Sequence, residues 1–229
     1  MAHKLVVLTL LSTFCSATQA GEVAVKVNEV ETLRAQGYSV GSITPIFSQL
    51  LMFSSPKDFV PAFEDAKTDF YLQESVLAGE SVNKWTQMIT ITGSKNLALN
   101  PNVTPKRFAD GMAGGFKAAC PNSFNAFGLG ETKFGDYSAF SAVISCGSAS
   151  PTKEQYSESL LLIVIKGDKD YYTVQWAERG KASEQPIKFD SDKWTDRFKK
   201  LMPIHLCPKV PGEKPPYPSC VDRKQKGAI

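Results

Sequence analysis

The residues that could carry out chemistry in this sequence are few, and histidine is the scarcest of them. His205 is the one histidine after residue 20, and it lies between Pro203 and Cys207. Zinc hydrolase sites draw on two or three imidazoles, and no HExxH motif is present, so a catalytic zinc is not favoured. A Ser-His-Asp triad needs only one histidine, but the G-x-S-x-G elbow is absent. We therefore expect His205 to cap the end of a helix.

Carboxylates are the second group of side chains that could do chemistry. Those that would suit acid or base catalysis are Glu64, Asp65, Asp69, Glu74, Glu131, Asp136 and Glu178. A pair of carboxylates on either side of a sugar bond hydrolyses glycosides, one as the acid and the other as base or nucleophile. No spacing in the sequence brings two of them together, so we expect each on a solvated face or in a turn. The sequence predicts no catalytic residue and no metal ligand.

The cysteines form the third group. After residue 20 they are Cys120, Cys146, Cys207 and Cys220. An even number of cysteines in an exported chain indicates disulfides, although four cysteines allow three connectivities. The spacing favours two local bridges, Cys120 with Cys146 and Cys207 with Cys220. Zinc binding and redox exchange are the alternatives, but both usually need a C-x-x-C pair, which the sequence lacks.

Aromatic residues supply the best candidate for a binding surface. Successive side chains of a strand point to opposite faces, so the pair Tyr171-Tyr172 places one ring on each face of a sheet. At least one of the two rings is then expected to be exposed and able to contact a partner. The predicted binding surface consists of Tyr171, Tyr172, Trp176 and Trp85.

The N-terminus has the three parts of a secretory signal. A short basic start (Met1 to Lys4) precedes the apolar run Leu5 to Leu11, and the small residues before Gly21 suit a signal peptidase. We predict that residues 1–20 are removed and that the protein is periplasmic or secreted. The apolar run is too short for a membrane anchor. Lipidation at Cys15 is not favoured, because the bulky Phe14 precedes it.

Composition and charge exclude several classes of protein. The chain has 229 residues, of which 42% are hydrophobic, as in ordinary folded domains. Its 26 Lys and Arg residues nearly balance 23 Asp and Glu residues, so no nucleic acid partner is expected. Beyond the signal, the longest apolar run is Leu160 to Ile165, far below the ~20 residues of a membrane-spanning helix. We expect no transmembrane segment in the mature chain.

Alternating apolar residues predict most of the secondary structure to be strand. The expected strands are Ile46 to Phe53, Phe59 to Phe63, Phe70 to Leu77, Trp85 to Thr92, Phe124 to Leu129, Tyr137 to Cys146, Ser159 to Lys166 and Tyr171 to Ala177. The turn at Gly167 to Asp170 marks the strongest hairpin.

Two helices interrupt this pattern. The first begins after Thr104, which can cap it, and carries Phe108, Met112 and Phe116 at helical spacing. Its glycines, Gly111, Gly114 and Gly115, suggest close packing of the helix on a sheet. The second helix begins near Asp190 and carries Trp194, Phe198, Leu201 and Met202 on one face before Pro203.

This order of elements predicts an α+β fold, a mostly antiparallel sheet flanked by helices and stapled by disulfides. The expected divisions are a signal peptide at 1–20, a peripheral N-terminal segment at 21–45, a single α+β domain at 46–207 and a Pro-rich basic tail at 208–229. Five prolines prevent the tail from continuing a helix or entering a sheet interior. A bridge from Cys220 to Cys207 would hold it against the domain.

The order of elements between Ile46 and Met202 resembles that of the Mog1/PsbP-like superfamily. The resemblance lies in the segment Trp85 to Thr92 before the first helix and in the paired strands before the last. It implies an antiparallel sheet flanked by helices and a role as a binding or assembly accessory. It implies no shared catalytic residue.

Together these observations favour a non-enzymatic exported protein that binds another protein or an envelope component through a sheet face or edge. No cofactor is expected. Two alternatives remain open: a carboxylate-based hydrolase of envelope sugars or peptides, and a periplasmic immunity or inhibitor protein that blocks a toxin.

Overall fold

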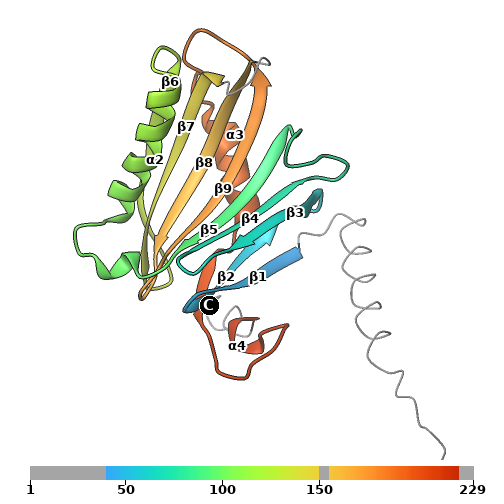
Figure 1. Cartoon of the computed structure of the whole chain (residues 1–229), viewed down its shortest axis with the longest axis vertical. Coiled ribbons are helices and arrows are strands. Elements are labelled where there is room, and N and C mark those ends of the chain that lie inside the picture. Colours follow the sequence, from blue (N-terminus) through green and yellow to red (C-terminus); the bar gives the residue numbers. More distant parts are fainter. Residues whose placement is uncertain (1–39, 150–154, 222–229) are drawn as a thin grey trace, which may run out of the picture.

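A computed structural model describes residues 40–149 and 155–221 of the chain (Figure 1). The predicted signal peptide at 1–20 and most of the peripheral segment at 21–45 lie outside the described residues, as does the basic end of the tail at 222–229. Within the two described ranges, no helix is long and apolar enough to cross a membrane.

The larger of two sheets has seven strands, and all neighbouring pairs are antiparallel. In order across the sheet, they are β3 (Phe59–Ala66), β4 (Phe70–Leu77), β5 (Gln87–Ser94), β9 (Tyr171–Lys181), β8 (Tyr156–Lys166), β7 (Tyr137–Ala149) and β6 (Phe124–Phe134). Leu160 and Leu162 of β8 belong to one core cluster, whereas Leu161 and Ile163 belong to another on the opposite face. An unbroken apolar run fits this strand because it is buried on both faces.

The smaller sheet has the strand order β1-β2-β10. Its strands are β1 (Val40–Ile46), β2 (Gln49–Ser55) and β10 (His205–Pro208). The prediction of one continuous strand over Ile46 to Phe53 is wrong, because the chain reverses at Phe47, whose φ is 48°. No glycine marks this reversal, and the apolar pattern runs through it. Strand β1 lies ahead of the domain boundary expected at residue 46.

Two of the helices pack on opposite faces of the large sheet. Helix α2 (Pro105–Ala119) begins as predicted, with the hydroxyl of Thr104 accepting a hydrogen bond from the Arg107 amide at 3.1 Å. Helix α3 (Ser191–Leu201) begins in the same way, since Asp190 accepts from the Lys193 amide at 3.0 Å. A 3-10 turn (η1, Leu97–Leu99) and the short α4 (Pro218–Val221) complete the described helices.

Each helix packs one apolar stripe against the sheet. Phe108, Met112 and Phe116 of α2 contact the core cluster that contains Leu160 and Leu162. Trp194 and Leu201 of α3 lie in the opposite cluster, which the small sheet also joins through Leu51 and Phe53. In Figure 1, α2 runs along β6 and β7, and α3 crosses behind the sheet. Helix α2 lies mainly over β6, β7 and β8, so β4, β5 and most of β9 are less covered on that side.

The glycines of α2 do not pack on the sheet as expected. Gly111, Gly114 and Gly115 are all exposed, and a Cβ atom at any of them would meet no atom within 4 Å. The prediction of close packing at these positions is wrong, because the large side chains of Phe108 and Phe116 face the sheet instead.

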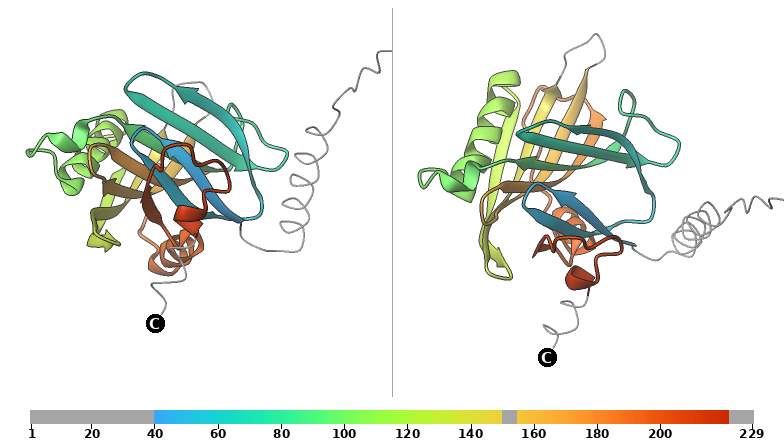
Figure 2. Two further views of the ribbon diagram at one scale, coloured as in Figure 1. Left: turned by 90° about the horizontal axis from the view of Figure 1, so that it is seen from below. Right: turned by 60° about the horizontal axis from the view of Figure 1, so that its bottom comes forward.

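Two disulfides have the pairing that the spacing favours. Cys120, after α2, is bonded to Cys146 of β7, with 5.8 Å between the Cα atoms. Cys207 of β10 is bonded to Cys220 of α4, with 5.5 Å between the Cα atoms. The second bridge is buried with Leu50 and Met52 of β2. In Figure 2, α4 and the segment before it lie beside the small sheet, on the side away from the large one.

Candidate binding groove

The aromatic surface predicted from the sequence is not exposed. Tyr171, Tyr172, Trp176 and Trp85 are all buried, at 1%, 0%, 5% and 8% of their full exposure. The ring of Tyr171 stacks on Phe108 of α2 at 5.4 Å, and Tyr172 lies in the core on the other face. The prediction that one ring of this pair would reach solvent is wrong, because both faces of β9 are covered at that point.

Most of the candidate carboxylates lie apart. Glu64 accepts a hydrogen bond from the Tyr71 hydroxyl at 2.7 Å, and Asp65 pairs with Lys67 at 3.1 Å. Glu178 holds two cations of α3, Lys193 and Arg197. Asp69, Glu131 and Asp136 are exposed. Only Glu74 shares a cavity with a second carboxylate.

That cavity, which we call the sheet groove, lies beside α2 on the same face of the large sheet. Its volume is about 410 Å³. It is lined by Leu72, Glu74, Val82, Trp85, Met88, Thr90, Thr92, Phe116, Glu158, Leu160, Gln175, Ala177 and Arg179. Four neighbouring strands of the sheet, β4, β5, β9 and β8, contribute to its lining.

The strand register places polar residues in two rows across the floor. Glu74 of β4 lies opposite Thr90 of β5, which lies opposite Gln175 of β9. In the next row, Thr92 lies opposite Thr173. Residues that pair directly across antiparallel strands have their side chains on the same face. Polar groups therefore occupy the centre of a face whose remainder, under α2, is apolar.

Hydrogen bonds organise this floor. The hydroxyls of Thr92 and Thr173 lie 2.7 Å apart, and the Gln175 amide donates to the Thr173 hydroxyl at 2.8 Å. These bonds satisfy the buried threonine hydroxyls and hold the Gln175 side chain over the floor. Gln175 and Thr90 are half-buried, so their polar groups reach the groove.

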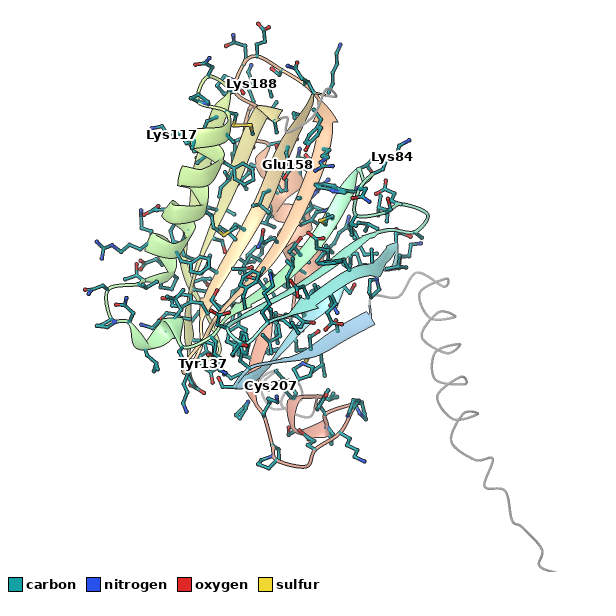
Figure 3. The ribbon with its side chains drawn as sticks, in the orientation of Figure 1. Lys84, Lys117, Tyr137, Glu158, Lys188 and Cys207 are labelled. Atoms are coloured by element: carbon teal, nitrogen blue, oxygen red, sulfur yellow. A yellow bond between two sulfur atoms is a disulfide. The ribbon has the colours of Figure 1, made fainter. Side chains whose placement is uncertain are left out.

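One end of the groove is closed by an arginine held between two aromatic rings. The guanidinium carbon of Arg179 lies 3.8 Å from the ring centroid of Trp85 and 4.1 Å from that of Tyr156. Its Nε donates to Glu158 at 3.2 Å. Stacking on both faces and the ion pair together fix the cation. Glu158 is thus paired with Arg179. In Figure 3, Glu158 lies on the sheet between α2 and the strands near Lys84.

Glu74 has a different environment. Its neighbours along β4 on the same face are Leu72 and Val76, and burial raises the pKa of its carboxyl. Among the described residues, no hydrogen bond or ion pair to this carboxylate is found. Within the part of the chain that the structure describes, Glu158 of the groove is thus paired with a cation and Glu74 is not.

Two exposed aromatic residues lie on the same face of the sheet as Glu74, towards the β3 edge. Phe63 of β3 pairs directly with Glu74, and Phe70 shares its face because alternate residues of β4 point the same way. The side chains of Phe63 and Phe70 are 43% and 37% exposed. A ligand in the groove would thus meet exposed aromatic rings next to a carboxylate.

The titration of Glu74 provides a first test of this geometry. An acid whose pKa is raised in the folded state binds its proton more tightly there, so its ionisation opposes folding. Glu74 should therefore reduce stability as the pH rises from its unfolded value of 4.5 through the folded pKa. We expect Glu74→Gln to be more stable than the wild type towards urea at neutral pH, and this gain to vanish well below pH 4.5.

The matched control is Glu131→Gln, which removes an exposed carboxylate on β6. It measures the general effect of losing one negative charge. A Glu74→Gln protein that is less stable than the wild type at neutral pH would show that the Glu74 carboxylate has a favourable partner in the folded state.

Sequence reasoning missed Glu158, Arg179, Thr90 and Gln175. A signal was present for Glu158, which interrupts the apolar alternation of β8 on the face of Leu160. For Thr90 and Gln175 the local pattern holds no signal, since polar residues on a strand usually face solvent. Among the described residues, no cluster of three His, Cys, Asp or Glu side chains could hold a metal ion.

No family model and no curated protein matches the chain. Several solved structures are similar at low identity. The Ran-binding protein Mog1p of Saccharomyces cerevisiae is 8% identical, with a TM-score of 0.40 over 72% of this chain and 86% of that chain. LpqN of Mycobacterium tuberculosis, involved in cell envelope biogenesis, is 11% identical, with a TM-score of 0.37 over 76% of this chain and 94% of that chain.

The immunity protein TplEi of Pseudomonas aeruginosa, solved with a peptide, is 12% identical, with a TM-score of 0.36 over 83% of this chain and 86% of that chain. The chain spans 47% of the length of another similar structure, from Bacteroides thetaiotaomicron. The resemblance to the Mog1/PsbP-like superfamily expected from the order of elements stays a prediction. The function proposed below rests on the groove.

Proposed function

We propose that this protein is an exported, non-catalytic binding protein that receives an extended segment of a partner protein in the sheet groove. The observation that carries the proposal is the Glu74 carboxylate, which has no partner among the described residues and lies opposite the exposed Phe63. A lysine or arginine of the partner would pair with Glu74, and burial of that pair would strengthen its hydrogen bonds. Apolar partner residues on either side would cover Phe63 and Phe70.

An extended segment suits the shape and polarity of the floor. The groove is bounded by Phe116 of α2 and by Trp85, and its floor offers the side chains of Thr90 and Gln175. A threonine hydroxyl and a glutamine amide can each donate and accept, as the backbone of an extended peptide requires. An immunity or inhibitor protein is one form of this function, in which the bound segment belongs to a toxin.

Export is part of the same proposal. The signal-like residues 1–20 and the two disulfides support a periplasmic or secreted location, since disulfides persist in oxidising compartments. We retain the division into a peripheral segment, a domain and a tail (208–229). The boundary between the first two moves from residue 46 to the start of β1 at residue 40. A partner in the cell envelope would meet the groove there.

Selection from a library of short random peptides tests the groove without knowledge of the partner. We expect the enriched peptides to carry a lysine or arginine flanked by apolar residues. Calorimetric titration of a synthetic enriched peptide should show that Glu74→Gln weakens binding by about tenfold, the effect of losing one charged hydrogen bond. Glu131→Gln, which removes a carboxylate outside the groove, should bind as the wild type does.

Two results would contradict the proposal. One is the enrichment of acidic peptides or of none. The other is an enriched peptide that binds Glu74→Gln as tightly as it binds the wild type.

The hydrolase alternative has less support, because Glu74 and Glu158 line one cavity but lie on β4 and β8, with β5 and β9 between them. Burial raises the pKa of Glu74, which suits a general acid, whereas Glu158 is paired with Arg179. Enzymes that cleave glycosides hold their two carboxyl groups about 5 to 9.5 Å apart, whereas residues on strands separated by two others are at least ~14 Å apart at the backbone. Turnover of chromogenic glycosides that is lost in both Glu74→Gln and Glu158→Gln, with the fold retained, would replace binding by hydrolysis.

A further inference from the structure

A second cavity lies on the opposite face of the large sheet, between α3 and the segment from β2 to β3. Its volume is about 480 Å³, in the range of small-molecule sites. The residues that matter for its chemistry are Lys57, Phe59, Trp176, Lys193, Arg197 and Lys200. We call it the basic pocket. Its α3 residues recur at helical spacing, so one face of the helix presents three cations to it.

Cations outnumber anions around the basic pocket. Lys193 and Arg197 share the single carboxylate Glu178, and Lys200 pairs with Asp196 at 2.7 Å. Lys57 has no ion-pair partner among the described residues. Asp58 also lines the pocket, so four cations face three carboxylates in and around it. One positive charge remains in excess.

Arg197 is the most buried of these cations. Its side chain is 12% exposed, and its guanidinium lies 5.0 Å from the ring centroids of both Trp176 and Trp194. Nη2 contacts Glu178 at 2.5 Å, whereas the buried Nη1 has no hydrogen-bond acceptor among the described residues. A buried donor without an acceptor is unfavourable. Arg197 thus brings to the wall of the pocket a cation that is incompletely hydrogen-bonded among the described residues.

Two aromatic rings contribute apolar surface to the basic pocket. The rings of Phe59 and Trp176 meet edge to face at 5.2 Å, and Leu77 lies beside them. The indole N–H of Trp176 donates a hydrogen bond to the side-chain oxygen of Gln87 at 3.0 Å, which fixes the orientation of the indole ring. A ligand that fits this cavity would thus combine an anionic group for the cations with an apolar body for the aromatic rings.

We propose that the basic pocket binds an organic anion with an apolar body, such as a medium-chain carboxylate. Its anionic group would lie among Lys57, Lys200 and Arg197, and its hydrocarbon part would lie against Phe59 and Trp176. This site is separate from the sheet groove, because the two lie on opposite faces of β9.

Octanoate is a suitable probe, with octanol and octylammonium as its neutral and cationic counterparts. Binding is followed by NMR through the indole N–H signal of Trp176, which is assigned by its loss in Trp176→Phe. We expect octanoate to shift this signal in a saturable way and the two counterparts not to. The double variant Lys57→Gln/Lys200→Gln changes two exposed side chains and should weaken octanoate binding by about fivefold.

The matched control is Lys117→Gln/Lys133→Gln, which removes two exposed charges elsewhere and should leave the octanoate affinity unchanged. Glu74→Gln should also leave it unchanged, so this proposal and the groove proposal can fail independently. Octanol binding as tightly as octanoate, an absence of a saturable shift, or equal affinities of the two double variants would overturn the proposal.

Discussion

Replacement of Asp170 by alanine is expected to lower the free energy of unfolding by about 4 kcal/mol, because several buried donors lose their acceptor at once. Asp170 is 1% exposed. One carboxylate oxygen accepts from the Ser48 amide at 3.1 Å, the Ser48 hydroxyl at 2.5 Å and the Tyr172 hydroxyl at 3.1 Å. The other accepts from the Asn96 amide at 2.7 Å. These bonds join the β1–β2 turn to the large sheet.

Burial alone would raise the pKa of Asp170, but the hydrogen bonds from Ser48, Asn96 and Tyr172 outweigh it and lower the pKa. A carboxylate with a lowered pKa stabilises the fold above its unfolded value, here 3.8, and this contribution is lost as the pH falls through the folded pKa. The effect of Asp170→Ala should therefore shrink in strong acid.

Urea denaturation at neutral pH and in acid measures both effects. Asp168→Ala, at the exposed neighbouring position in the same turn, is the control and should change stability far less. Asp170→Asn keeps an acceptor and should fall between the wild type and Asp170→Ala. A loss below about 1 kcal/mol for Asp170→Ala at neutral pH would show that the donors find other acceptors.

Removal of either disulfide is the second large effect. The double variant Cys207→Ala/Cys220→Ala should lose about 3 kcal/mol, because the unfolded chain regains the freedom of a closed loop. The bridge Cys120–Cys146 closes a longer loop, with a sequence separation of 26 against 13, so its loss should be slightly greater. Thermal or urea unfolding of the two double variants compares them directly.

The disulfide variants also test whether stability and binding are separate. The Cys207–Cys220 bridge is buried with Leu50 and Met52 of the small sheet, away from the sheet groove. Peptide affinity should therefore be retained in Cys207→Ala/Cys220→Ala at temperatures where that protein is folded. A loss of affinity in the folded variant would place the tail in the binding site.

Local signals explain why the helices could be predicted. Thr104 and Asp190 cap α2 and α3 through their own side chains, within the next turn of the chain. The apolar stripes of both helices follow from a spacing that is visible over a few residues. The β1–β2 turn could not be predicted, because Phe47 takes a left-handed conformation that its residue type does not indicate.

The site was harder to predict because it depends on pairing between distant strands. The alternation in β9 indicates two faces but not what covers each one, so the sequence predicts an exposed ring at Tyr171 or Tyr172 where α2 and the core cover both. Glu74 of β4 and Gln175 of β9 share one row because both strands pair with β5. Along the chain, however, β9 comes after β5 only once α2 and three further strands have formed. No local pattern carries that information.

The position of a bound peptide on the protein tests the central claim most directly. Backbone amide signals are followed by NMR while an enriched peptide is titrated into the protein. The groove proposal predicts saturable shifts centred on Thr90, Thr92 and Gln175, and an affinity about tenfold weaker in Glu74→Gln. Shifts centred instead on the β6 edge or on the basic pocket, with Glu74→Gln binding as the wild type does, would contradict it.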